Sequence, residues 1–140
     1  MQNCVALGVD FGTRYWGVAV GNLATGMASP CQSLRANQGI PNWHEFISLC
    51  QQWRPNIIVF GLPLNMDGTA QPITHKVKEI AAETAERTGL PVQFQDERLS
   101  TVEARAILFE RGGYKSLTKD KVDALSAVII LEDWFENQTQ

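Results

Sequence analysis

Two short apolar runs, interrupted by no polar residue, constrain the fold of this chain most. Residues 5–9 have the sequence VALGV and residues 57–61 have the sequence IIVFG. Runs of this length predict strands buried on both faces, because a half-exposed strand would alternate apolar and polar residues. Such strands occur mainly in parallel sheets that helices cover on both sides. We therefore expect an α/β fold.

The patterns between these runs predict the order of the elements. Strands are expected at 4–10, 15–21 and about 26–35, joined by short glycine-containing turns as in an antiparallel meander. A helix capped by Asn42 and ended by Pro55 then leads into the strand at 57–61. Pro72 suits the first turn of a second helix that extends to Gly89, and a fifth strand follows at 91–96.

Two further helices complete the predicted order. Residues 100–103 (STVE) have the form of a capping box that opens a helix ending at Gly112 and Gly113, and Thr118 can cap a last helix through Phe135. The order βββαβαβαα predicts a five-stranded mixed sheet, its first three strands antiparallel, flanked by helices. With 140 residues, the chain is expected to form a single domain over residues 1–140.

Composition excludes several classes of protein. A hydrophobic share of 44% and a charged share of 19% are those of an ordinary globular protein, and no stretch reaches the roughly 18 apolar residues of a membrane span. The N-terminus lacks the pattern of a signal peptide, so we expect a cytoplasmic protein with no membrane partner. The cysteines and histidines match neither a disulfide framework nor a zinc site: Cys4, Cys31, Cys50, His44 and His75.

Three acidic residues stand where an apolar element ends or continues. Asp10 closes the first apolar run, Glu97 follows the strand at 91–96, and Asp123 shares a helical stripe with Ala127, Ile130 and Trp134. The carboxyl ends of parallel strands meet at one sheet edge, where ligands of open α/β sheets bind. Carboxylates that leave water there need compensation, and the usual one is a bound cation. We expect Asp10, Glu97 and Asp123 to converge and hold magnesium.

Each of these acids also has an ordinary structural interpretation. Asp10 could accept backbone N–H bonds within the turn that follows it. Glu97 could pair with Arg98 or Arg105 on the surface, and Asp123 could favour the positive end of the last helix. The metal site is absent only if all three interpretations hold together.

The net charge of −3 argues at face value against a nucleic-acid partner, but the basic residues are unevenly distributed. Six of the twelve lie between positions 98 and 121, where only Glu103, Glu110 and Asp120 oppose them. This basic segment lies between two of the suspected metal ligands. It predicts either a solvated helix face or contacts to phosphate groups.

Five motifs occur in order along nearly the whole chain: residues 9–14 (VDFGTR), 17–20 (GVAV), 61–68 (GLPLNMDG), 96–101 (DERLST) and Lys119-x-x-x-Asp123-x-x-Ser126-Ala127. Together they resemble the YqgF family, also called RuvX. Members have a ribonuclease H-like fold and are described as Holliday junction resolvases or as nucleases that mature the 5′ end of pre-16S ribosomal RNA. The resemblance implies that Asp10, Glu97 and Asp123 are the catalytic acids.

The activity that the resemblance implies is metal-assisted hydrolysis of phosphodiester bonds by one or two Mg²⁺ or Mn²⁺ ions held by these carboxylates. The candidate phosphate contacts are Arg14, Arg98, Lys115, Lys119 and Lys121. An RNA precursor is the favoured partner, with ribosomal particles as a related one. Branched DNA is the alternative, and symmetric cleavage of a junction would require a two-fold dimer.

Two rival classes of protein share parts of this pattern. Residues 9–13 (VDFGT) also resemble the first phosphate loop of sugar kinases and Hsp70-type ATPases. Those proteins close two such domains over a nucleotide, whereas 140 residues supply one, so no nucleotide cofactor is expected. The other rival is a non-catalytic module that binds RNA or the ribosome. Failure to bind Mn²⁺ would favour that module.

Overall fold

The computed structural model describes residues 4–97 and 119–138. Its elements, in chain order, are β1 (Val5–Asp10), β2 (Tyr15–Asn22), β3 (Met27–Asn37), β4 (Ile40–Pro41), α1 (Trp43–Trp53), β5 (Ile57–Leu62), α2 (Pro72–Thr88), β6 (Val92–Asp96) and α4 (Lys119–Gln138). The helix predicted after the capping box at Ser100 and the cap at Thr118 lie outside these residues. No described helix is long and apolar enough to cross a membrane.

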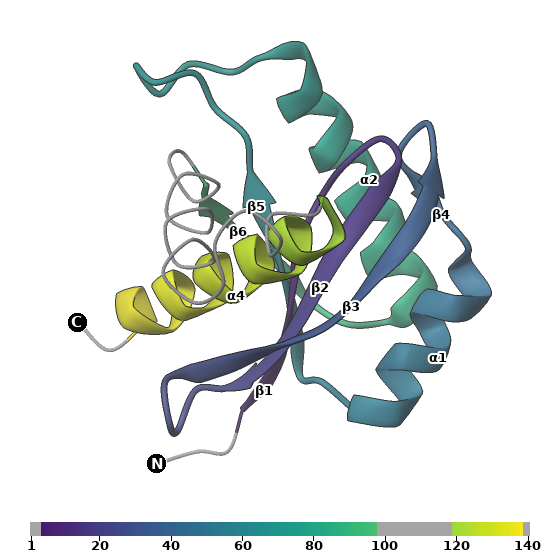
Figure 1. The fold of residues 1–140 in the computed structure, drawn as a ribbon, viewed down its shortest axis with the longest axis vertical. Helices are drawn as coiled ribbons and strands as arrows, with labels where there is room; N and C mark the ends of the chain where they lie inside the picture. Colours follow the sequence, from purple (N-terminus) through teal and green to yellow (C-terminus); the bar gives the residue numbers. More distant parts are fainter. Residues whose placement is uncertain (1–3, 98–118, 139–140) are drawn as a thin grey trace.

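The strands form one mixed sheet in the order β4-β3-β2-β1-β5-β6 (Figure 1). The meander of β1, β2 and β3 is antiparallel, and β5 and β6 lie parallel to β1, as the sequence predicts. The carboxyl ends of β1, β5 and β6 therefore share one edge of the sheet. In register, Val9 pairs with Phe60, and Gly61 pairs with Gln95.

The predicted count of five strands is wrong by one. The additional strand β4 has two residues and pairs with the end of β3 through a tight turn at Gln38 and Gly39. Both turn residues have positive φ, 52° and 85°, which is the conformation of the two-residue turns that match strand twist. Pro41 fits in β4 because an edge strand needs no further N–H donor on its open side. A strand this short, placed directly before a helix cap, has no periodicity to recognise.

The first two helices begin and end at the predicted signals. The Asn42 side chain accepts a hydrogen bond from the Glu45 N–H at 3.3 Å, which caps α1. At α2, Pro72 occupies the first turn, and Gly89 ends the helix with a φ of 71°. Both helices are therefore specified locally.

The sheet separates two hydrophobic cores. Helices α1 and α2 cover one face, and α4 crosses the other (Figure 1). Because side chains alternate along a strand, Leu7 and Val9 enter the core beneath α1 and α2, whereas Ala6 faces α4. Trp16 is fully buried at the centre of the first core, edge-on to Phe46 and Phe60.

Helix α4 lies very close to the sheet. A Cβ at Gly8 would be only 3.0 Å from the Ala127 carbonyl oxygen, so glycine is what allows this approach. Further along the helix, Phe135 packs at Gly21, which pairs with Ala6 in β1. Towards its N-terminus, α4 therefore advances towards the carboxyl ends of the parallel strands. This direction brings its first turns towards the edge where Asp10 lies.

Candidate functional site

Asp10 is the last residue of β1 and is half-buried. Its neighbour Val9 points into the core of α1 and α2, so alternation places Asp10 on the face that α4 crosses. The turn after it is tight, because a Cβ at Gly12 would lie 2.5 Å from the Tyr15 carbonyl oxygen. The chain therefore turns sharply directly after Asp10.

Glu97 lies beside Asp10 although Asp10 ends β1 and Glu97 follows β6, two strands that β5 separates. Its backbone N–H donates to the Leu62 carbonyl at 3.3 Å, at the end of β5. A Cβ at Gly61 would stand 2.6 Å from Glu97 Oε2 and 2.5 Å from Ile130 Cδ1. The Glu97 side chain therefore lies across β5, in space that any residue larger than glycine would fill.

The carboxyl groups of Asp10 and Glu97 form a hydrogen bond. Two carboxylates can make such a bond only if one of them carries a proton. Burial raises the pKa of Glu97, the hydrogen bond with Asp10 lowers it, and the charge of Asp96 raises it further, for a net increase. Sequence reasoning predicted the convergence of these two acids, and the structure brings them together.

The place of Asp123 is described only through the backbone of α4. Its side chain lies outside the described part of the structure, and among the described residues no group of three potential metal ligands occurs. The stripe that Asp123 was predicted to share is confirmed, since Ala127, Ile130 and Trp134 are all buried. Asp123 precedes Ala127 by one turn, on the part of α4 that approaches the carboxyl edge.

The carboxylate oxygens of Asp10 and Glu97 suit a hard cation. Carboxylate oxygens are the ligands that Mg²⁺ and Mn²⁺ prefer, and a cation between two neighbouring acids relieves their mutual repulsion. The space above Gly61 lets the Glu97 carboxylate approach Asp10 rather than remain over its own strand. The arrangement can therefore hold a divalent ion at the sheet edge.

Of the predicted phosphate contacts, the structure places Arg14. It is exposed in the turn between β1 and β2, four residues after Asp10. Arg98 and Lys115 are outside the described ranges, as is Arg105, the other possible partner of Glu97. Lys119 and Lys121 belong to the first turns of α4, where only the backbone is described.

Sequence reasoning missed the residues that hold α4 and Glu97 in place. Trp134 Nε1 donates to Gln93 Oε1 at 3.1 Å, and Asn137 Nδ2 donates to Gln95 Oε1 at 3.0 Å, so α4 is tied to β6. Gly61 was a usable signal, because a glycine at the end of a run of bulky residues often marks a close approach. The glutamines gave no signal, since only the fold places them against α4.

Comparison with known proteins identifies the family of the chain. The family model RuvX, described as "Holliday junction resolvase", matches residues 4–137. A protein from Shewanella denitrificans is 54% identical over 98% of this chain and 97% of its own length. One from Pectobacterium carotovorum is 53% identical over 99% of both chains. Both relatives carry the name "Putative pre-16S rRNA nuclease".

Solved structures confirm the predicted ribonuclease H-like fold. RuvC from T. thermophilus, solved with a Holliday junction substrate, aligns with a TM-score of 0.59 over 97% of this chain and 96% of its own, at 14% identity. The yeast mitochondrial Holliday junction resolvase aligns with a TM-score of 0.53 over 96% of this chain and 78% of its own, at 12% identity. At these identities the likeness concerns the fold.

Proposed function

The chain belongs to the RuvX family, and on that premise we propose that it is a metal-dependent nuclease that processes the 5′ end of pre-16S ribosomal RNA. The observation that carries the proposal is the hydrogen-bonded pair of Asp10 and Glu97 at the carboxyl edge of the parallel strands. Two acids in a half-buried position repel each other when both are charged. A fold that keeps them together gains most when a cation binds there.

In this proposal Asp10, Glu97 and Asp123 hold Mg²⁺ or Mn²⁺, as one ion or as two. A bound ion of this kind acts as a Lewis acid on a phosphodiester and lowers the pKa of a coordinated water. The chain itself contributes the positioning of the acids. A bound cation favours the charged form of Glu97, and burial among β5, β6 and α4 fixes the direction of its carboxylate. Arg14, which is exposed four residues after Asp10, contacts a phosphate of the substrate.

The choice of substrate follows from charge and from the relatives. A junction resolvase grips two duplex arms and needs many phosphate contacts, whereas this chain has a net charge of −3. A single processed strand needs fewer contacts, and two relatives above 50% identity are named for pre-16S ribosomal RNA. Cleavage of four-way DNA junctions is the second candidate, because the family model itself is described by that activity.

A direct competition decides between the two substrates. The intact protein is given equal amounts of a labelled pre-ribosomal leader RNA and a labelled four-way junction, in Mn²⁺ at physiological salt. We expect the RNA to be cut faster, at the end of the precursor. Symmetric nicking of the junction at the higher rate would make resolution the primary activity. Cleavage of neither, with no Mn²⁺ binding, would favour a non-catalytic RNA-binding module.

A further inference from the structure

A groove of about 760 Å³ lies beside the turn between β3 and β4. Its lining includes Arg35, Asn37, Gln38, Ile40, Asn42 and Glu45. We propose that this β3–β4 groove binds the phosphodiester backbone of a substrate strand that continues from the Asp10 site. The proposal rests on the proposed nuclease function and adds a second contact region, with Arg35 and Lys76 as phosphate-binding residues.

The groove is connected to Asp10 through the register of the sheet. Asp10 pairs with Gly17, Gly17 pairs with Ser33, and two residues further along Tyr15 pairs with Arg35. At ordinary sheet spacings, the Cα atoms of Asp10 and Arg35 are therefore roughly 12 Å apart. A strand held at Asp10 reaches Arg35 within a few nucleotides.

Arg35 also projects from the same face of the sheet as Asp10. Trp16 and Leu34, which pair with each other, both point into the core of α1 and α2. Their neighbours Tyr15 and Arg35 alternate to the opposite face, as Asp10 does. Tyr15 is half-buried beside the arginine, so it offers an aromatic edge for a base next to a cation for a phosphate.

Two further cations belong to segments that contact the groove residues. Gly39 lies between the groove residues Gln38 and Ile40, and a Cβ at this position would be 3.1 Å from Lys76 Cε. Lys76 therefore packs against the β3–β4 turn. The carbonyl of Arg14 accepts a hydrogen bond of 2.7 Å from the N–H of Ala36, which also lines the groove. Of these three cations, Arg35 lines the groove, and Lys76 and Arg14 belong to segments that contact its turn and strand β3.

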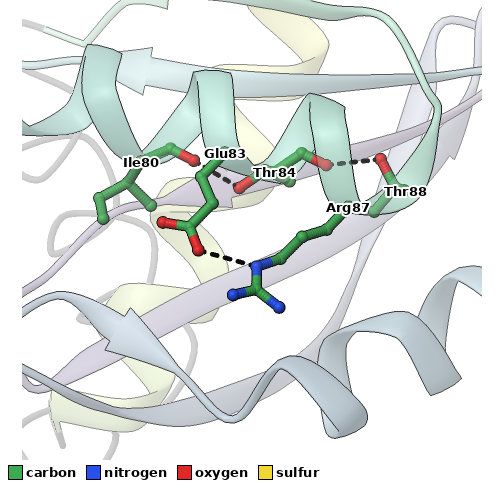
Figure 2. A network of polar contacts seen from close by, with 5 residues as sticks. All are labelled: Ile80, Glu83, Thr84, Arg87 and Thr88. Atoms are coloured by element: carbon green, nitrogen blue, oxygen red, sulfur yellow. Dashed lines mark hydrogen bonds and ion pairs between the residues drawn. The ribbon is translucent and has the colours of Figure 1, made fainter.

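Arg87 of α2, in contrast to these cations, already pairs with an acidic side chain. Arg87 donates to Glu83 at 2.8 Å and stacks over Trp43 at 4.7 Å (Figure 2 shows the pair with Glu83). Among the described residues, Arg14, Arg35 and Lys76 make no ion pair with a carboxylate. Glu45 is the one acid in the groove lining. Within the lining Arg35 balances Glu45, and Lys76 and Arg14 in the segments that contact it add the positive charge that suits a polyanion.

The turn that carries the groove is held in one conformation. The Gly39 N–H donates to the Thr13 carbonyl at 2.8 Å, and the buried Trp16 Nε1 donates to the Gly39 carbonyl at 3.1 Å. These bonds fix the β3–β4 turn to the β1–β2 turn and to the core. A groove formed before binding loses little conformational entropy when a strand enters it.

The test compares two double variants with the wild-type protein. Arg35→Gln with Lys76→Gln removes the arginine of the groove lining and the lysine beside its turn. Arg54→Gln with Lys78→Gln removes an arginine at the end of α1 and a lysine of α2 outside the groove lining. Binding of a single-stranded RNA oligonucleotide is measured by fluorescence anisotropy across a salt series, with Ca²⁺ in place of Mn²⁺. We expect the groove variant to flatten the slope of log K against log salt by about 1.4, since each phosphate contact on a single strand contributes about 0.7.

The control variant should keep the wild-type slope. The proposal would be overturned if the groove variant had the wild-type slope, or if the control variant changed the slope by the same amount. Either result would leave the nuclease function intact as long as the protein still cleaves RNA in Mn²⁺. A wild-type protein that neither binds nor cuts nucleic acid would overturn both. Binding of polyglutamate that the groove variant loses, with RNA binding unchanged, would assign the groove to an acidic protein and overturn the proposal as well.

Discussion

Within the site, Glu97 has a pKa that departs from its ordinary value. It follows the edge strand β6, yet its carboxylate lies over Gly61 and reaches Asp10. Burial is the main reason that its pKa is raised, and the contact with Asp10 opposes that effect without cancelling it. In the absence of a cation, the folded protein therefore retains a proton on Glu97 to a higher pH than the unfolded chain does.

This proton makes stability depend on pH in a defined direction. Because the folded-state pKa of Glu97 is above its ordinary value of 4.5, its contribution to stability is complete below that value and is lost as pH rises through the folded pKa. We predict that Glu97→Gln, measured in EDTA, removes this decrease and is more stable than wild type at pH 7. Urea unfolding from pH 4 to pH 8 checks it. Glu79→Gln, on the exposed side of α2, should retain the decrease, and a parallel loss in both variants would contradict the interpretation.

At the level of the elements, Gly61 of β5 leaves the space in which the Glu97 side chain and Ile130 of α4 lie against this strand. Predicting this site from the sequence depended on one rule, that the carboxyl ends of parallel strands share an edge, and the rule correctly brought Asp10 and Glu97 together. The sequence also predicted the apolar stripe of α4, formed by Ala127, Ile130 and Trp134. The sequence did not predict that Arg35 and Lys76 lie near the same turn. Their arrangement depends on β4, a strand too short to predict, and on the register between β2 and β3.

The glycine at the end of β5 gives a prediction about metal binding. In Gly61→Ala the new methyl group displaces the Glu97 carboxylate and Ile130 Cδ1, both ends of flexible side chains, so the fold should persist with a loss of about 1–3 kcal/mol. Affinity for Mn²⁺ should fall about tenfold or more, because the ligand loses its orientation. Calorimetric titration measures this affinity.

The matched control is Gly21→Ala, at the far end of the contact between β2 and α4. There a methyl group would lie 2.6 Å from the Met27 carbonyl oxygen and 2.8 Å from Phe135, so the destabilisation should be at least as large. Its Mn²⁺ affinity should equal that of the wild type. If both variants lose the same affinity, the effect of Gly61→Ala is a general loss of packing and Gly61 does not position Glu97.

For the whole molecule, the distribution of charge matters more than its sum. The chain is acidic overall, but Asp10 and Glu97 meet at one sheet edge, with Arg14 and Arg35 at the neighbouring turn and strand. The sequence indicated an α/β fold, and the apolar runs, helix caps and turns were sufficient for that. It indicated a basic segment at 98–121 but not the groove cations, because residues far apart in the chain form a patch only once the sheet is assembled.

The central claim is that Asp10 acts with Glu97 and Asp123 to hold a divalent cation, and one measurement tests it most directly. Mn²⁺ is titrated calorimetrically into the wild-type protein and into Asp10→Asn and Asp123→Asn, and the melting of all three is recorded in EDTA. We predict that the wild type binds Mn²⁺ and that both variants lose this binding while melting in EDTA at the wild-type temperature or slightly above it, because removing one of several converging charges relieves repulsion. Unchanged Mn²⁺ binding in Asp10→Asn, or a loss of several degrees in EDTA, would contradict the claim and make Asp10 a structural residue.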